Sequence, residues 1–318
     1  MKAFVTGGAG FIGSHVVDRL IQDGRSVTAF DNLSTGFEEN LSGHAGSGFL
    51  TIHRGDVLDA AALTRAMEGH DILFHFQANA DVRGGIKNTR ADLEQNTIGT
   101  WNALEAARLA GVQTIVFASS ATVYGEPAIF PTPEGCPLVQ TSLYGASKLA
   151  GEAMLQAYAE YFGIRSIIFR FVSWIGPRYS HGVVFDFVKK LLANPRKLEI
   201  LGDGKQVKSY LDVRDGVSGI FCAVDRFQGK KGIFNLGHDA FLNVLDLARI
   251  VTSELGLDGV EFVTSGGERG WLGDSPVVHL DTLRIKELGW SPRISIEEGL
   301  RATTRFLMEN PRLLEQRN

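Results

Sequence analysis

Three polar side chains in the middle of the sequence have the types and the order that proton transfer requires. Tyr144 and Lys148 stand four residues apart in YGASK, so they would share one face of a helix. Tyrosine with its ordinary pKa of about 10 is a poor base at neutral pH, but a nearby ammonium would favour the phenolate. Ser120 in SSATVYG (119–125) could bridge Tyr144 and a substrate oxygen. Such pairs also arise by chance on surface helices, and serines cap turns, so these residues alone leave both interpretations open.

The segments around these residues alternate between short apolar runs and helical patterns. We expect strands at 2–6, 26–31, 49–56, 71–78, 114–120 and 166–172, and helices at 14–24, 59–69, 89–110 and 143–162. This alternation predicts a Rossmann-type α/β fold, with a doubly wound parallel sheet and helices on both faces. Ser120 would then end the fifth strand, at the carboxyl edge where open parallel sheets bind ligands.

After residue 172 the alternation gives way to isolated strands and more frequent Gly and Pro. We expect strands at 198–204, 232–237 and 260–263, and helices at 183–193, 212–226, 243–256 and 295–309. The sequence thus predicts a Rossmann domain at 1–172, to which 212–238 returns, and a smaller mixed α/β lobe at 173–318. No clear linker separates them, so we expect a broad shared interface, where ligand clefts tend to form.

A glycine turn follows the first expected strand. In TGGAGFIG, Gly7, Gly10 and Gly13 would permit a tight turn and let a pyrophosphate approach the backbone at a helix N-terminus. Asp31 ends the second strand, where a carboxylate accepts hydrogen bonds from ribose hydroxyls and repels a 2′-phosphate. Because the following NLSTG contains no Arg or Lys, we expect NAD rather than NADP. Asp56 would either meet the adenine edge or cap a helix at 57–69.

The composition excludes several other classes of protein. Lys and Arg number 32 against 36 Asp and Glu, a net charge of −4, which argues against a nucleic-acid partner. No apolar run approaches the roughly 20 residues of a membrane span, and no signal peptide fits the N-terminus. Cys136 and Cys222 lack metal-ligand spacing, so we expect no metal and reduced thiols in a cytoplasmic protein.

The segments TGGAGFIG, DNLSTG, SSATVYGE and YGASKLAGE together resemble the extended short-chain dehydrogenase/reductase superfamily, in particular its NAD-dependent epimerase/dehydratase family. Within that family the chain is most similar to the UDP-glucose (UDP-galactose) 4-epimerase group, through LGDG, SYLDVRD and RGWLGD as well. The resemblance implies a tightly bound, recycled NAD and a transient 4-keto sugar. Tyr144 would remove the proton of the 4-hydroxyl, Lys148 would hold the nicotinamide ribose, and Ser120 would share the hydrogen bond to the 4-oxygen.

The resemblance also implies two sets of binding residues. By matching positions, the cofactor would meet Gly7, Gly10, Phe11, Ile12, Asp31, Asn32, Ser34, Thr35, Gly36, Asp56, Val57, Phe76, Gln77, Ala78, Asn96, Tyr144, Lys148 and Phe171. In the smaller, nucleotide-sugar-binding lobe and the adjoining edge of the sheet, the substrate would meet Arg83, Ser120, Thr122, Tyr144, Ser173, Arg178, His181, Lys208, Arg269 and Asp274. An alternative for Asn96 is that its amide ties down a loop.

Departures from related patterns bear on the reaction. Related 4,6-dehydratases carry an acidic pair directly after the catalytic Ser or Thr, where this chain has Ala121 and Thr122. Related UDP-glucuronate decarboxylases carry Glu at the position of Thr122, so the absence of both acids favours epimerisation. The resemblance assigns Lys208, which could otherwise be a solvated lysine, to the diphosphate, and Asp274 to the uridine ribose. Ser173 replaces the usual Asn. Arg269, a second candidate for the diphosphate, stands two residues before the usual Arg position, where Trp271 lies. Arg178 and His181, which otherwise would be loop residues, keep a UDP-glucuronate 4-epimerase open because a uronate needs a cation.

Three functions from different classes remain open on the sequence. The first is a UDP-hexose 4-epimerase acting on glucose, galactose or N-acetyl forms. The second is a nucleotide-sugar dehydrogenase or ketoreductase that releases its cofactor, and the third is an NAD-binding regulator without catalysis. The resemblance further implies a homodimer formed through the helices at 89–110 and 143–162. Val278 matches the position that would limit the space near carbon 2 of the sugar.

Overall fold

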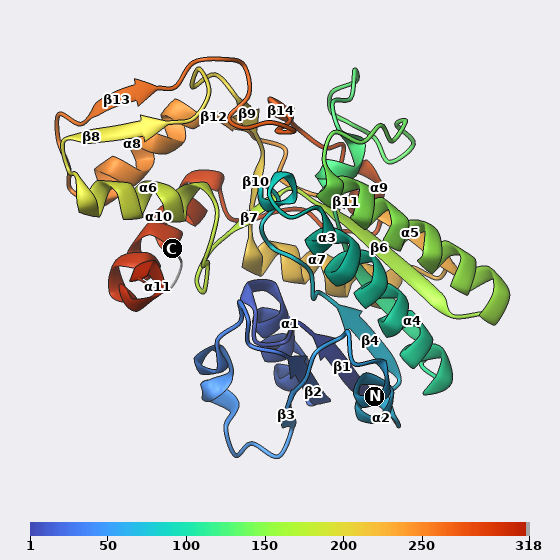
Figure 1. Cartoon of the computed structure of the whole chain (residues 1–318). Coiled ribbons are helices and arrows are strands. Elements are labelled where there is room, and N and C mark those ends of the chain that lie inside the picture. Colours follow the sequence, from blue (N-terminus) through green and yellow to red (C-terminus); the bar gives the residue numbers. More distant parts are fainter. Residues whose placement is uncertain (316–318) are drawn as a thin grey trace.

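The computed structural model describes residues 1–315, and a seven-stranded sheet forms its centre (Figure 1). The strand order is β11-β6-β5-β4-β1-β2-β3, and every neighbouring pair is parallel. The strands are β1 (Lys2–Thr6), β2 (Ser26–Asp31), β3 (Leu50–Arg54), β4 (Ile72–His75), β5 (Thr114–Ser120), β6 (Arg165–Phe171) and β11 (Lys231–Leu236). The predicted Rossmann-type fold is therefore confirmed.

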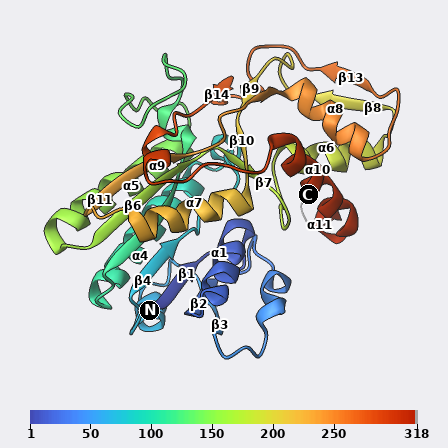
Figure 2. The same cartoon turned by 180° about the vertical axis from the view of Figure 1, so that it is seen from behind.

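Helices cover both faces of this sheet, as Figures 1 and 2 show from opposite sides. One face carries α1 (Phe11–Gln22) and α7 (Val213–Arg226), which pack against each other. The other face carries α2 (Ala60–Met67), α4 (Gly99–Leu109) and α5 (Leu143–Phe162). The segment that contains α7 and β11 thus belongs to the central sheet and its helix layer. In the sequence it follows residues of the second lobe.

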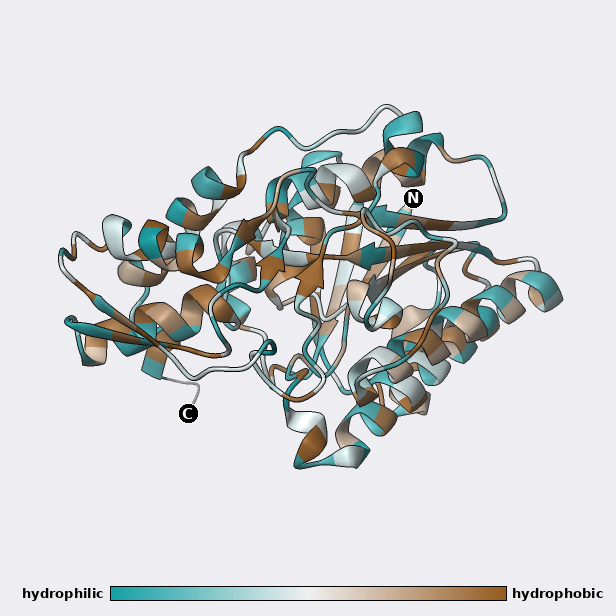
Figure 3. Cartoon of the chain, turned by 90° about the horizontal axis from the view of Figure 1, so that it is seen from above, coloured by the Kyte–Doolittle hydropathy of each residue, from teal (hydrophilic) through white to brown (hydrophobic). Residues whose placement is uncertain are grey.

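The strands are apolar on both sides because each side packs under a helix layer. Phe4 and Val5 are adjacent in β1 and fully buried, yet they belong to separate apolar clusters on the two faces. Phe117 and Val116 divide in the same way in β5, as side chains that alternate along a strand must. Figure 3 shows hydrophobic strands between helices of mixed hydropathy. Burial on both faces explains the unbroken apolar runs in the sequence.

Local sequence signals set the ends and the depth of α5. Ser142 caps its first turn by accepting a hydrogen bond from Gly145 N at 3.1 Å, and Gly163 ends it in a left-handed conformation, with φ of 75°. At Gly151, a Cβ atom would lie 2.6 Å from the ring of Phe117. The missing side chain therefore lets α5 lie close on β5, the strand that ends at Ser120.

The long helix predicted at 89–110 is wrong as a single α-helix. It comprises α3 (Thr89–Asp92), a π-helical segment η3 (Leu93–Ile98) and α4. The wider turn contains the buried Asn96, whose amide binds groups on both sides of it. Hydrophobic periodicity in the sequence predicts a helix, but it does not reveal a single wide turn within that helix. Such π-helical turns are frequent at functional sites.

The second lobe is built mainly after residue 172 and packs around its own apolar cluster. Its helices are α6 (Val183–Ala193), α8 (Val244–Glu254), α9 (Leu283–Glu287), α10 (Ile296–Glu309) and α11 (Arg312–Glu315), although α9 contacts β11. Its short strands form three small sheets: β7 (Ser173–Ile175) with β10 (Tyr210–Asp212), β8 (Lys197–Ile200) with β13 (Glu261–Thr264), and β9 (Val207–Lys208) between β12 (Leu242–Asn243) and β14 (Val277–Val278). Three short 3₁₀ segments in the first half are η1 (Glu38–His44), η2 (Gly84–Ile86) and η4 (Ala121–Tyr124).

The described part of the chain, residues 1–315, contains neither a membrane-spanning helix nor a metal cluster. No helix there is both long and apolar enough to cross a bilayer. Nor do three or more His, Cys, Asp or Glu side chains in that range gather into a potential metal site.

Candidate active site

The predicted catalytic residues lie where the end of β5 meets the first turns of α5. Lys148 is 2 % exposed, and its Nζ donates a hydrogen bond to the carbonyl oxygen of Ala118 at 2.9 Å. The same Nζ lies 5.8 Å from the centroid of the Tyr144 ring. Ser120 is two residues beyond Ala118, at the carboxyl end of the strand. The fold therefore gathers Ser120, Tyr144 and Lys148 at one sheet edge, with the lysine anchored beneath.

The electrostatics of this group favour a charged lysine and, without cofactor, a neutral tyrosine. Burial lowers the pKa of Lys148 to about 8, against the opposing effect of the Asp92 and Glu152 carboxylates. Burial, and then the Asp92 carboxylate, raise the pKa of Tyr144 well above its ordinary value. These shifts come from the protein's own groups. A bound nicotinamide would add a positive charge to that of Lys148 and favour the phenolate.

Ser120 and Thr122 supply hydroxyls beside this group. Ser120 Oγ accepts a hydrogen bond from Thr122 N at 3.2 Å and so caps η4. The alternative that Ser120 caps a turn is therefore correct, but this contact uses only an acceptor position, and the hydroxyl hydrogen can still be donated to a substrate. Thr122 Oγ1 is buried and has no hydrogen-bond partner among the described residues.

The glycine turn between β1 and α1 forms a cradle for a pyrophosphate. Gly7 has φ of 69°, and a Cβ there would lie 2.9 Å from Gln77 N, so a side chain would close the turn. Gly10 precedes α1 and no side chain caps the helix, which leaves first-turn amides of Phe11 and Ile12 directed at the turn. The buried Gln77 Oε1 beside this turn has no partner within residues 1–315. These features fit a dinucleotide.

Asp31 is held in the orientation that a ribose site needs. Its Oδ2 accepts a hydrogen bond from Ala9 N at 3.0 Å, and its Oδ1 accepts one from Leu33 N at 2.8 Å. Burial raises the pKa of Asp31, and these two amides oppose that rise. The loop at 34–36 follows and returns to the glycine turn, where Phe37 N donates to Ala9 O at 3.0 Å. This loop contains no basic side chain, which fits NAD.

Asp56 lies beside this loop and does not cap the following helix. Its Oδ2 accepts from Asn32 Nδ2 at 2.9 Å and its Oδ1 accepts from Leu58 N at 2.9 Å. The cap of α2 is Asp59, which accepts from Ala62 N. The N-cap alternative for Asp56 is therefore wrong, because the helix begins at residue 60, later than the sequence suggested.

Asn96 serves the protein's own architecture. Its Oδ1 accepts from Asn79 N at 2.7 Å, and its Nδ2 donates to Asp92 Oδ1 at 3.1 Å and to Ser147 Oγ at 2.9 Å. The alternative that its amide ties down a loop therefore describes the structure. Through Ser147 it also links the π-helical turn to the helix that carries Lys148.

The other predicted cofactor residues line the same edge of the sheet. Phe76, Gln77 and Ala78 directly follow β4, and Gln77 Nε2 donates to Gln95 Oε1 at 2.8 Å. Val57 is buried and follows β3. Phe171 is the last residue of β6, and its ring centroid lies 4.4 Å from that of Trp174.

The two cations predicted for the diphosphate both face acids of the protein. Lys208 Nζ lies 2.5 Å from Asp274 Oδ1, and Asp274 is 5 % exposed. Asp274, predicted for the uridine ribose, also accepts from Gly270 N at 3.2 Å. Arg269 forms an ion pair with Glu126, just beyond the SSATVYG segment. Glu126 was not predicted from the sequence, because a separation of 143 residues gives no local signal for this pair.

The remaining predicted sugar residues are distributed around the lobe. Arg83 Nη2 lies 3.4 Å from Asp186 Oδ2 on α6, which links the first domain to the second lobe. Arg178 has φ of 66° and its Nη1 lies 2.7 Å from Asp18 Oδ2 on α1. His181 stacks on Tyr179 with ring centroids 6.0 Å apart, while Ser173 is exposed in β7. Arg178 is thus paired with an acidic side chain of α1.

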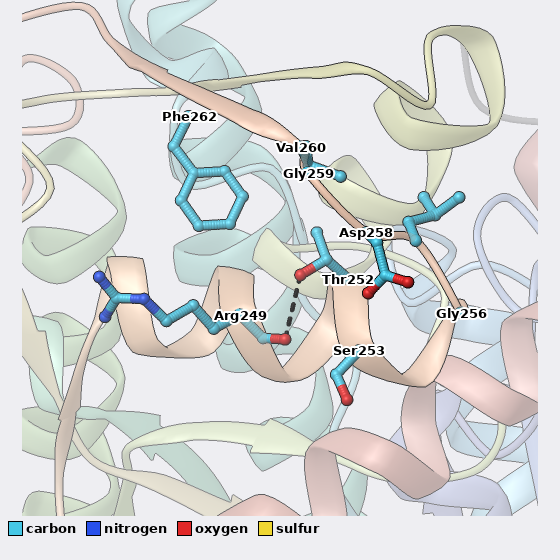
Figure 4. Close-up of a pocket in the computed structure, with 9 residues that line it drawn as sticks. Arg249, Thr252, Ser253, Gly256, Asp258, Gly259, Val260 and Phe262 are labelled. Carbon is cyan, nitrogen blue, oxygen red and sulfur yellow. Dashed lines mark hydrogen bonds between the residues drawn. The ribbon is translucent and has the colours of Figure 1, made fainter.

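A shallow pocket elsewhere in the lobe is not the site. It has a volume of about 370 Å³ and lies between α8 and the start of β13 (Figure 4). None of the residues predicted to bind cofactor or substrate lines it. Its lining residues are Arg249, Thr252, Ser253, Gly256, Leu257, Asp258, Gly259, Val260 and Phe262.

A parallel sheet with a glycine turn after β1 and a Ser, Tyr and Lys group beside β5 is the arrangement of short-chain dehydrogenases/reductases. The model of the NAD dependent epimerase/dehydratase family matches residues 3–237, and the chain belongs to that family. The family is NAD dependent, in agreement with the fit of Asp31 and the glycine turn.

Similar proteins extend over the whole chain. The UDP-glucose 4-epimerase of Mycolicibacterium smegmatis is 35% identical over 314 residues, which cover 96% of this chain and 98% of that protein. A crystal structure of a UDP-galactose 4-epimerase is 38% identical, with a TM-score of 0.88 and coverage of 98% and 99% of the two chains. The Thermus thermophilus UDP-glucose 4-epimerase in complex with NAD is 32% identical, with a TM-score of 0.87 and coverage of 97% and 99%.

Proposed function

We propose that this protein is an NAD-dependent UDP-hexose 4-epimerase that retains its cofactor through each turnover. The observation that carries this proposal is the complete Ser120, Tyr144 and Lys148 group at the sheet edge, with no acid at residues 121 and 122. A reaction that only moves a hydride out and back needs one acid–base residue and no second acid. The names of the similar proteins support the same substrate class.

NAD bound at the glycine turn would supply the acceptor for the hydride of carbon 4 and the donor for its return to the opposite face. Tyr144 Oη takes the proton of the 4-hydroxyl and later gives it back to the 4-oxygen. Ser120 Oγ donates to that oxygen, and Lys148 holds a positive charge beneath the phenol. Because the same proton and hydride are returned, no net oxidation occurs.

In this proposal the second lobe recognises the nucleotide. Residues 1–172 and 212–238 form the NAD domain, and the rest of 173–318 forms the nucleotide-sugar domain. Lys208 is half-buried and oriented by Asp274, so its remaining N–H groups are available to a diphosphate. Arg269 would exchange Glu126 for a phosphate when substrate binds. The uncharged hexose then occupies the space between Thr122, Ser173 and His181.

The ion pair of Arg178 argues against a uronate as the preferred sugar. A UDP-glucuronate 4-epimerase needs a cation for the carboxylate in addition to those that bind the diphosphate. Arg178 is engaged with Asp18 on α1, and Arg83 with Asp186 on α6. We therefore favour UDP-glucose, UDP-galactose or their N-acetyl forms over UDP-glucuronate.

We further propose a cytoplasmic homodimer formed through α4 and α5. Apolar side chains are exposed on and around these helices. Trp101 and Phe162 are each 49% exposed, Leu93 is 51% exposed and Tyr161 is 79% exposed. Such a patch on two long adjacent helices is typical of a protein interface.

The experiment that tests the function uses purified protein without added NAD. The protein is incubated separately with UDP-glucose, UDP-N-acetylglucosamine and UDP-glucuronate, while the products and the absorbance of reduced nicotinamide are followed. We expect the 4-epimer of a neutral UDP-hexose and no net absorbance change. Tyr144→Phe should lower kcat at least about a hundredfold with NAD content unchanged. A need for stoichiometric NAD would instead indicate a dehydrogenase, and unchanged turnover of the variant would refute the role of Tyr144.

A further inference from the structure

A buried polar network lies directly behind the candidate catalytic group. It joins Ser119, the neighbour of Ser120 in β5, to Glu152, which follows Lys148 by four residues in α5. Arg170 of β6 completes the contact. All three side chains are inaccessible: Glu152 is 0% exposed, Arg170 is 2% and Ser119 is 3%.

The contacts satisfy the Glu152 carboxylate on both oxygens. Ser119 Oγ donates to Glu152 Oε1 at 2.5 Å, and Arg170 Nε donates to the same oxygen at 3.0 Å. Arg170 Nη2 donates to Glu152 Oε2 at 2.7 Å. The arrangement is a bidentate ion pair with one added neutral donor, and it fixes the orientation of the carboxylate.

The far side of Arg170 is equally constrained. Its Nη1 donates to Tyr124 Oη at 2.9 Å and to Glu134 O at 3.0 Å. Tyr124 Oη in turn donates to Asn235 Oδ1 at 2.6 Å. Burial, opposed by Arg170, raises the pKa of Tyr124 to about 12, so this hydroxyl remains a donor at neutral pH. The network therefore ties β5, η4, α5, β6 and β11 together through buried side chains.

Two polar bonds connect α5 to the last residues of β5, and they run in opposite directions. Lys148 Nζ donates from the helix to Ala118 O of the strand, while Ser119 Oγ donates from the strand to Glu152 of the helix. The residues involved are consecutive in β5 and one turn apart in α5. Together the bonds fix how far α5 is displaced along β5, which sets the spacing between Ser120 and Tyr144.

We propose that Ser119 and Glu152 are positioning residues. They hold the hydroxyls of Ser120 and Tyr144 at the spacing at which both can contact the 4-oxygen of the sugar. This inference rests on the proposed 4-epimerase function. A buried ion pair is weak evidence for stability in itself, since apolar side chains of similar size often serve as well. A fixed position of α5 along β5 matters for catalysis, because a displacement of a reacting group by about 1 Å can lower the reaction rate about a hundredfold.

The test compares two buried serines that both bind α5. Ser119→Ala removes the strand-to-helix bond near Tyr144 and leaves the Arg170–Glu152 pair intact. Ser166→Ala is the matched control, because Ser166 is 1% exposed in β6 and its Oγ donates to Leu155 O of the same helix at 3.3 Å, farther from Tyr144. Both variants should lower the thermal midpoint by similar amounts.

The kinetic measurements use UDP-galactose and its 4-deuterated form at a temperature where all variants are folded. For Ser119→Ala we expect kcat to fall about tenfold or more, KM to stay within about twofold, and the isotope effect on kcat to rise. Ser119→Thr, which keeps a hydroxyl, should recover much of the rate, and Ser166→Ala should keep kcat within about twofold.

The outcomes separate this inference from the function on which it rests. If the wild-type protein epimerises UDP-galactose and Ser119→Ala matches Ser166→Ala in kcat and isotope effect, Ser119 has only a structural role and the inference is overturned. If the wild-type protein epimerises no nucleotide sugar, the proposed function fails and the positioning role fails with it.

Discussion

The charge of Lys148 should control the rate in a pH-dependent way. Its Nζ lies 5.8 Å from the centroid of the Tyr144 ring in a buried setting. With an effective dielectric constant of about 20, a unit charge at that distance stabilises a phenolate by roughly 3 kcal/mol, or about two pKa units. Lys148→Met should therefore lower kcat about a hundredfold at pH 6.5, where Lys148 is protonated.

The pH dependence follows from the direction of the lysine shift. Burial lowers the pKa of Lys148 to about 8, so the ammonium is present below pH 8 and is lost as the pH rises through that value. The advantage of wild type over Lys148→Met should shrink from about a hundredfold at pH 6.5 towards a few-fold above pH 9. Lys148→Arg, whose guanidinium stays charged across this range, should show no such loss with pH.

The assay is kcat for UDP-galactose between pH 6 and pH 9.5, with NAD content measured for every preparation. Measuring bound NAD separates a loss of cofactor from a loss of proton transfer. A ratio of wild type to Lys148→Met that is the same at pH 6.5 and pH 9 would refute the electrostatic argument. A loss of less than about threefold at pH 6.5 would do so as well.

Three further changes test the cofactor site, the interface and the buried ion pair. Asp31→Ser should weaken NAD binding by at least about tenfold and improve the relative binding of NADP, measured by titration, and an unchanged preference would contradict the ribose contact. Trp101→Glu should convert a dimer to a monomer in light scattering, whereas Leu283→Glu, an equally drastic change at an exposed site outside α4 and α5, should not. Arg170→Met should lower the free energy of unfolding in urea by about 3–5 kcal/mol because Glu152 is left as an unpaired buried charge, and adding Glu152→Met should restore much of it. Equal stability of the single and double variants would show that the pair is not coupled.

The sequence alone determined the strands of the first domain and the nature of its ligand. Apolar runs bounded by glycine or polar residues indicated the six expected strands, and β5 and α5 have the bounds predicted for them. These signals are local: a strand buried on both faces must be apolar, and Ser142 and Gly163 mark helix ends by their own conformational preferences. The glycine turn and Asp31 are likewise local, because both lie within one strand–helix–strand unit.

Only the tertiary structure decided which partners the polar residues have. The ion pairs Lys208–Asp274 and Arg269–Glu126 join residues that are at least 66 positions apart in the sequence. Arg178 likewise forms an ion pair with Asp18 of α1. The two-residue strands of the second lobe and the wide turn around Asn96 were not predicted, because neither contains enough residues to show a period. Ion pairs and hydrogen bonds between residues far apart in the sequence depend on how the helices and loops pack on the sheet. That is why the sequence identified Ser120, Tyr144 and Lys148, whereas the contact between Ser119 and Glu152 behind them emerged only from the fold.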